Sequence, residues 1–155
     1  MTNIRLKSKL LYIATTLVLA IFFIIDRLLK NLAMRIDQDV EIISNILYFS
    51  LTKNYYISFS IPLSGILLNI AISVLVILLL LYIIYLIIGK KSPKLEIFLL
   101  LAMFLGALSN IIDRLSLGFV IDYIEIRHFS ALNLADILIS VSAIWLIIGN
   151  IRKGR

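Results

Sequence analysis

Two aspartates near the C-terminal end of the sequence stand beside long apolar segments. Asp122 lies inside the apolar run 119–124, and Asp136 opens the last apolar segment, shortly after Asn133. A carboxylate buried in hydrocarbon costs about 3 kcal/mol, so acids at such positions usually have a specific role. Apolar neighbours disfavour the ionised form of Asp122, whereas a helix start favours the ionised form of Asp136. This contrast predicts one site in which the two carboxyl groups act as an acid and base pair.

Polar residues on the neighbouring segments are expected to support this pair. Asn110, Asp113 and Arg114 follow the spacing i, i+3, i+4, which places them on one face of a helix. Asn133 is a suitable N-cap for the last helix, which puts Asp136 in its first turn. The simpler alternatives are that Asp136 is only a helix-start acid and that Asp113 and Arg114 form a structural ion pair.

Two further residues are expected at the same level of the molecule. Asp26 is followed four positions later by Lys30, in the order that favours an ion pair on one helix face. This pair either reaches toward the membrane interface or faces inward and orients the site. Asn54 is placed in the same layer by the segment that follows the first helix.

The composition indicates an integral membrane protein. The chain has 155 residues, of which 62% are hydrophobic, and its mean hydropathy is +1.09, well above a soluble domain. It has no cysteine and one histidine, His128, so a metal site, a thiol nucleophile and a serine–histidine–aspartate triad are poorly supported. We therefore expect no metal and no cofactor. The net charge of +6 is concentrated at the ends of apolar spans, which favours membrane topology over nucleic-acid binding.

Hydropathy and charge predict a single integral membrane domain over residues 1–155, all-α except for a small β-sheet. The basic N-terminus, the basic 89–94 loop and the basic C-terminus are expected in the cytoplasm. The sheet and a loop at 118–133 are then expected on the outer face, together with the aspartate pair. The four transmembrane helices are predicted at about 10–34, 64–88, 95–117 and 134–149.

The outer β region is predicted at about 36–62, between the first two helices. Its segments EIISNILYFSLT and YYISFSI are rich in β-branched and aromatic residues, which is typical of strands. Lys53 and Asn54 are predicted to form the turn between them.

Several short motifs resemble the lipoprotein signal peptidase family (signal peptidase II), which consists of intramembrane aspartic endopeptidases. The resemblance extends over essentially the whole chain and rests on five motifs in order. They are Asp26-Arg27-Leu28-Leu29-Lys30, Lys53-Asn54 with Phe59, Gly106-Ala107-Leu108-Ser109-Asn110-Ile111-Ile112-Asp113-Arg114, Gly118-Phe119-Val120-Ile121-Asp122-Tyr123, and Asn133-Leu134-Ala135-Asp136.

The resemblance implies an activity, a location and a set of site residues. The activity is removal of the signal peptide from diacylglyceryl-modified prolipoproteins before the lipidated cysteine, at the outer face of the bacterial cytoplasmic (inner) membrane. The expected partners are the prolipoprotein, membrane lipids and the inhibitor globomycin. The catalytic residues implied are Asp122 and Asp136, supported by Asp26, Asn54, Asn110, Arg114 and Asn133.

The sequence departs from the family at a few positions. Tyr56 and Ser109 replace usual glycines, and Arg27 stands where glutamine is common. Tyr56 in particular conflicts with a tight turn, because a tyrosine rarely adopts a positive φ. The alternative function is a non-catalytic membrane protein, either a relative that binds lipoproteins without cutting them or an ion- or proton-handling helper. The absence of acids from the middle of the spans favours the enzyme over a proton pathway.

Overall fold

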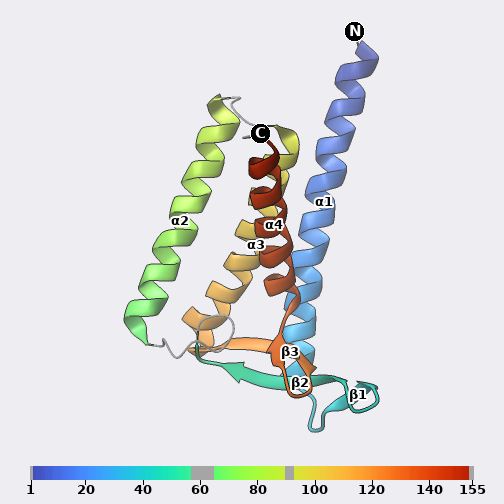
Figure 1. Cartoon of the computed structure of the whole chain (residues 1–155), viewed down its shortest axis with the longest axis vertical. Helices are drawn as coiled ribbons and strands as arrows, with labels where there is room; N and C mark the ends of the chain where they lie inside the picture. Colours follow the sequence, from blue (N-terminus) through green and yellow to red (C-terminus); the bar gives the residue numbers. More distant parts are fainter. Residues whose placement is uncertain (1, 57–64, 90–92, 154–155) are drawn as a thin grey trace.

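In the described part of the chain, four helices form a bundle that carries a small sheet at one end (Figure 1). The computed structural model describes residues 2–56, 65–89 and 93–153. The start of α1 and the end of α4 lie at the end of the bundle opposite the sheet. The helices are α1 (Thr2–Ala33), α2 (Ile66–Gly89), α3 (Lys94–Leu117) and α4 (Leu134–Lys153).

Three of these helices are long and apolar enough to cross a membrane. Within the described ranges they are Ile66–Gly89, Lys94–Leu117 and Leu134–Arg152. α2 exposes large aliphatic side chains, with Leu67 80% and Ile88 77% accessible. Such an exposed apolar surface is stable against lipid but not against water. The fold therefore places these helices in a bilayer. Membrane crossing by α1, the remaining span expected from the sequence, stays a prediction.

The sheet has four antiparallel strands in the order β1-β2-β3-β4. β1 (Val40–Ile43) and β2 (Leu47–Asn54) precede α2, and β3 (Val120–Ile126) and β4 (Ser130–Leu132) lie between α3 and α4. The prediction of a loop at 118–133 was therefore wrong, because this segment forms the hairpin of β3 and β4. Its sequence VIDYIEI is rich in β-branched residues, and the polar groups at Asp122 and Glu125 masked that pattern.

The predicted turn at Lys53 and Asn54 was also wrong. Both residues belong to the end of β2, and the turn falls between β1 and β2. Asn45 adopts a left-handed conformation there, with φ 55°, which asparagine tolerates better than most residues. Most of the second predicted strand, YYISFSI, lies outside the described residues.

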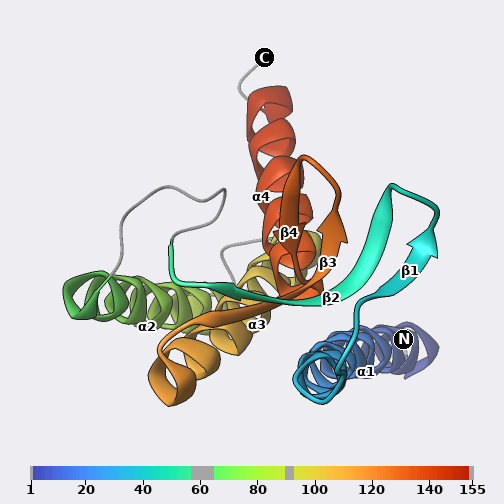
Figure 2. The ribbon, with the colours of Figure 1, turned by 90° about the horizontal axis from the view of Figure 1, so that it is seen from below.

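β2 and β3 run side by side across the ends of the helices (Figure 2). Their register pairs Asn54 with Val120 and Thr52 with Asp122. Because residues two positions apart share one face of a strand, Asn54 and Asp122 lie on the same face as diagonal neighbours. The chain reaches β3 from α3 through Gly118, whose φ of 83° ends the helix.

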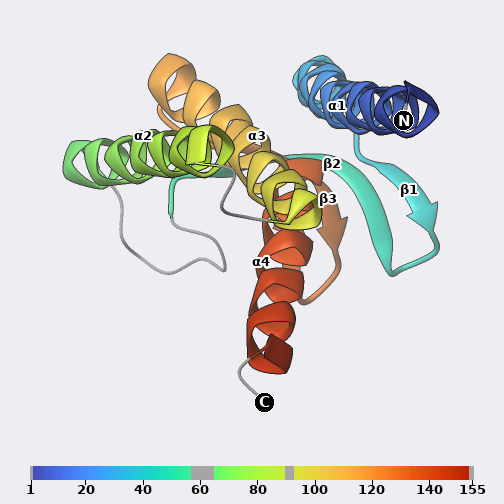
Figure 3. The same cartoon turned by 90° about the horizontal axis from the view of Figure 1, so that it is seen from above.

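α3 contacts each of the other three helices (Figure 3). It approaches α4 closely at Gly106, where an added Cβ would lie 2.7 Å from the Ala135 carbonyl oxygen. This contact fixes the first turn of α4 against α3. Two small apolar clusters complete the packing. In the first, Ala33 at the end of α1 packs against Ile121 and Tyr123 of β3. In the second, α2 and α3 meet through Ile83, Leu86 and Leu100.

Candidate active site

Asp136 lies in the first turn of α4, within a reciprocal cap. The Asn133 side-chain oxygen accepts a hydrogen bond from the Asp136 N–H (2.9 Å). In return, the Asp136 carboxylate accepts one from the Asn133 N–H (3.4 Å). This arrangement is the one found in a capping box, so the predicted N-cap at Asn133 is confirmed. It holds the Asp136 carboxylate at the helix N-terminus, where unpaired N–H groups favour a negative charge.

Asp122 lies on β3 and is almost completely buried, with 1% of its surface accessible. One carboxylate oxygen accepts a hydrogen bond from the side-chain amide of Asn54 (2.9 Å) and the other from that of Asn133 (2.6 Å). Burial, followed by the negative charge of Asp136, raises the pKa of Asp122 to about 7, although the two amides oppose this shift. The proton of Asp122 is therefore lost only as the pH rises through about 7.

Asn133 joins the two acids. Its side-chain nitrogen contacts Asp122 and its backbone nitrogen contacts Asp136. The second oxygen of the Asp136 carboxylate accepts a hydrogen bond from Asn110 (2.7 Å). The structure thus brings together the two acids that the sequence singled out, one from β3 and one from α4.

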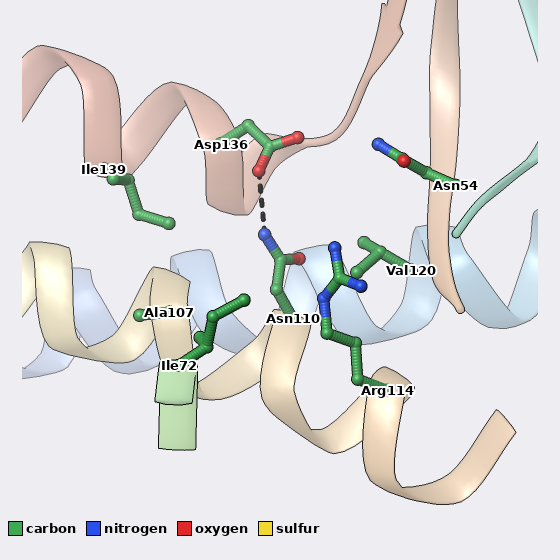
Figure 4. A pocket seen from close by; sticks show the side chains of 8 residues that line it. All are labelled: Asn54, Ile72, Ala107, Asn110, Arg114, Val120, Asp136 and Ile139. Atoms are coloured by element: carbon green, nitrogen blue, oxygen red, sulfur yellow. Dashed lines mark hydrogen bonds between the residues drawn. The ribbon is translucent and has the colours of Figure 1, made fainter. Parts of the chain in front are cut away.

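A cavity of about 110 Å³ opens beside Asp136. In Figure 4, the polar side chains of Asn54, Asn110, Arg114 and Asp136 point toward this common space. Asp122 does not line the cavity itself, but Asn54 both lines it and contacts Asp122. The remaining lining side chains, from Ile72, Ala107, Val120 and Ile139, are apolar.

A second, larger groove of about 510 Å³ shares Asn54, Asp136 and Ile139 with this cavity. It follows the outer side of α4 and the β4 strand, where its lining is mainly apolar. The carboxylate of Asp136 therefore lies where a polar cavity meets an apolar groove.

The segment after β2 is held by side chains on both sides. The Tyr56 N–H donates to the Asn54 side-chain oxygen (3.0 Å), and the Arg114 guanidinium donates to the Tyr56 carbonyl. Tyr56 does not adopt a positive φ, so the tyrosine fits without the strain that the sequence suggested. The first bond also fixes the Asn54 amide, because its oxygen faces Tyr56 and its nitrogen faces Asp122.

A buried charge cluster lies behind the aspartate pair, between α1 and α3. Lys30 and Asp113 are each 0% accessible and form an ion pair of 2.7 Å. Arg27 pairs with the other oxygen of Asp113 at 2.5 Å, and Asp26 lies 3.3 Å from Lys30. Asp113 therefore pairs with cations on α1 and not with Arg114. The i, i+4 pair of Asp26 and Lys30 is fully buried, so of the two alternatives left open by the sequence the structure shows the inward-facing one.

Asp26 connects this cluster to the start of α4. One of its oxygens accepts hydrogen bonds from the Tyr123 hydroxyl (3.0 Å) and the Ala135 N–H (3.2 Å). The other accepts one from the Ser109 hydroxyl (2.5 Å). The Tyr123 hydroxyl in turn accepts a hydrogen bond from the Leu134 N–H (3.0 Å). Asp26 therefore fixes the helix turn that carries Asp136.

All the polar residues singled out in the sequence meet at one end of the bundle, in two layers. The cavity layer holds Asn54, Asn110, Arg114 and Asp136, with Asp122 and Asn133 directly behind it. Asp26 belongs to the deeper cluster. The sequence analysis did not predict a role in the site for Lys30 or Tyr123. For Lys30 a signal was present, because a charged residue in an apolar helix usually has a functional role. Within the described ranges, no group of three or more histidine, aspartate or glutamate side chains is arranged to hold a metal ion.

Comparison with solved structures places this fold among bacterial membrane enzymes. One such enzyme, solved by the in meso method, superposes with a TM-score of 0.79 at 24% identity, over 91% of this chain and 89% of its own. A second gives a TM-score of 0.72 at 25% identity, over 88% and 91%. The protein thus has the fold of a bacterial membrane enzyme, with an aspartate pair at one end of the bundle.

Sequence relationships make the identification more specific. The pattern of the family described as Signal peptidase (SPase) II matches residues 18–152. A lipoprotein signal peptidase of Clostridium tetani is 32% identical over 145 residues, or 88% of this chain and 92% of its own. One from Halothermothrix orenii is 31% identical over 135 residues, or 85% and 91%. The chain belongs to the signal peptidase II family, and it is a bacterial membrane protease.

Proposed function

We propose that this protease removes signal peptides from diacylglyceryl-modified prolipoproteins, cutting before the lipidated cysteine, and that Asp122 and Asp136 are its catalytic residues. The observation that carries the proposal is the joining of the two carboxyl groups through Asn133, in contrasting environments. Asp122 is buried on a strand, whereas Asp136 borders the cavity at a helix N-terminus. Such a contrast allows one acid to hold a proton while the other is ionised.

Asp136 is assigned the role of general base. It borders the cavity, and its oxygens accept hydrogen bonds from Asn110 and from the Asn133 backbone, which stabilise the ionised form. A water held beside it loses a proton to this carboxylate and attacks the carbonyl carbon of the scissile peptide bond. Asp122, with its raised pKa, donates its proton to the developing oxyanion and stabilises the tetrahedral intermediate. When the intermediate collapses, Asp136 passes the proton taken from water to the leaving nitrogen, the carbon–nitrogen bond breaks, and Asp122 takes its proton back as the carbonyl group reforms.

The surroundings of the pair suit a lipid-modified substrate. The apolar groove along α4 begins at Asp136, so acyl chains can remain in an apolar environment while the peptide bond reaches the carboxylates. Arg114 and Asn54 line the cavity and are proposed to hold the substrate backbone. The basic chain ends support a topology in which both termini lie in the cytoplasm and the site lies on the outer face of the inner membrane.

The test is cleavage of a lipidated prolipoprotein by the detergent-purified protein, with and without globomycin. We expect globomycin-sensitive cleavage by the native protein. Asp122→Asn and Asp136→Asn should each reduce the rate by about 10³-fold or more, because each removes a proton-transfer group. Glu41→Gln, which neutralises an exposed acid on β1, is the matched control and should cleave normally. Unchanged cleavage by both aspartate variants would refute the catalytic assignment.

A further inference from the structure

Lys30 contacts the side chain of Asn110, which in turn contacts Asp136. Its ammonium group is completely buried and donates to Asp113 (2.7 Å), to the Asn110 side-chain oxygen (2.8 Å) and to the Ser109 hydroxyl (3.3 Å). Asp26 completes its surroundings at 3.3 Å. A lysine that served only to neutralise buried carboxylates would not need the contact with Asn110.

That contact determines which way the Asn110 amide points. An ammonium group can only donate hydrogen bonds, so the oxygen of Asn110 must face Lys30. The amide nitrogen then faces Asp136 and donates to it at 2.7 Å. The side-chain nitrogen of Asn133 also donates to the side-chain oxygen of Asn110, at 3.3 Å, which reinforces this orientation of the Asn110 amide. A donor aimed at Asp136 favours its ionised form, whereas the reversed amide would present an oxygen and repel it.

We propose that Lys30 is a positioning residue that keeps Asp136 ionised, by locking the Asn110 amide with its N–H group toward the carboxylate. The inference rests on the proposed function and goes further, because it names the residue that prepares the base. Lys30 touches no substrate. It acts through the side-chain amide of Asn110.

Other charged groups also act on Asp136, and the test must separate them from Lys30. Asp26 on α1 and Asp122 on β3 disfavour a second negative charge nearby, whereas Arg114 on α3 favours it. Asp113 on α3 is already paired with Lys30 and Arg27. From α2, the cavity beside Asp136 is lined by Ile72, which is apolar.

The first test compares Lys30→Met with Arg27→Met. Both remove a cation that pairs with Asp113, but only Lys30 contacts Asn110. Lys30→Met should lower kcat about tenfold to a hundredfold at neutral pH, as expected for loss of one hydrogen bond to a charged group, with KM within about twofold. The acidic limb of its pH profile should move to higher pH by about one unit, because the ionised base is no longer favoured. Arg27→Met should leave both kcat and the limb unchanged.

Two further variants keep the proposal testable if Lys30→Met folds poorly. Lys30→Met combined with Asp113→Asn removes one charge of each sign from the cluster and should show the same shifted limb. Lys30→Met combined with Asn110→Ala should be no slower than Asn110→Ala alone, because both changes interrupt one path. Additive losses in this double variant would overturn the proposal, since Lys30 would then act by another route.

A readout independent of cleavage separates this inference from the proposed function. The ¹⁵N-labelled side-chain amide of Asn110, assigned by its loss in Asn110→Ala, should respond to ionisation of the carboxylate it contacts. Its pH midpoint should rise in Lys30→Met and stay fixed in Arg27→Met. Failure of the native protein to cleave prolipoprotein would count against the proposed function alone. An unchanged amide midpoint in Lys30→Met, or equal shifts in both variants, would overturn the role of Lys30.

Discussion

Two pairs of aspartates lie at the same end of this bundle and differ in how their charge is balanced. Asp26 and Asp113 are surrounded by cations, with ion pairs of 2.5–3.3 Å to Arg27 and Lys30. Asp122 and the half-buried Asp136 accept hydrogen bonds from amides of Asn54, Asn110 and Asn133 instead. The inner cluster thus contains equal numbers of acidic and basic side chains, whereas the outer pair is held by neutral donors.

The difference explains why one pair can do chemistry and the other holds the fold together. A carboxylate locked to an ammonium group loses its basicity, and removing one partner leaves an uncompensated buried charge. A carboxylate held by amides keeps its orientation while its proton affinity still responds to burial and to nearby charge. Asn110 separates the two kinds of environment, since it contacts Lys30 on one side and Asp136 on the other.

The sharpest way to break this comparison is to neutralise one acid from each pair. Asp113→Asn leaves Lys30 and Arg27 without their shared partner, and should lower the free energy of unfolding by about 3 kcal/mol. Asp136→Asn should abolish cleavage but change stability little, because no ion pair is lost. Thermal unfolding in detergent measures the first effect, and prolipoprotein cleavage measures the second. If Asp136→Asn were the more destabilising variant, the division between scaffold and site would be wrong.

The sequence predicted much of the site, because acids and amides in an apolar chain are conspicuous. The aspartate pair and the cap at Asn133 followed from residue type and position alone. The sequence did not reveal β3, because Asp122 interrupts its apolar pattern. It also did not reveal that Lys30 is buried, because the preference of a helix face depends on what packs against it. The pairing of Asp113 with α1 depends on how α1 and α3 meet, and local spacing contains no information about that contact.

The pH dependence of cleavage tests whether the outer pair, Asp122 and Asp136, is the pair that titrates. The pKa of Asp122 is raised to about 7, mainly by burial and by the charge of Asp136. If protonated Asp122 is the acid, the rate must fall as pH rises through about 7. Asn54 donates to the ionised form, so Asn54→Ala should raise this pKa further and move the basic limb upward by about one unit.

The matched control is Thr52→Val, two residues earlier on β2 and opposite Asp122 in the strand pairing. It keeps the Asn54 amide, so the basic limb should stay in place. A basic limb that moves downward in Asn54→Ala would mean that the titrating group is not Asp122.

The smallest effect is expected at Ser109, which belongs to the inner cluster. Its hydroxyl donates to Asp26 at 2.5 Å and accepts a longer hydrogen bond from Lys30 at 3.3 Å. Ser109→Ala removes both and should lower stability by about 1–2 kcal/mol. Ser116→Ala is the control on the same helix, because that exposed hydroxyl bonds only to backbone oxygens of its own helix, those of Ile112 and Asp113. It should change stability by about 0.5 kcal/mol or less.

Neither serine variant should alter the pH profile of cleavage, since the Asn110 amide keeps its contact with Lys30 at 2.8 Å. Melting temperature and pH profile, measured on the same preparations, therefore report on different layers. A Ser109→Ala protein that melted normally but showed a displaced acidic limb would place Ser109 with the titrating groups. The boundary between the two layers would then lie between Ser109 and Asp26, and not at Asn110.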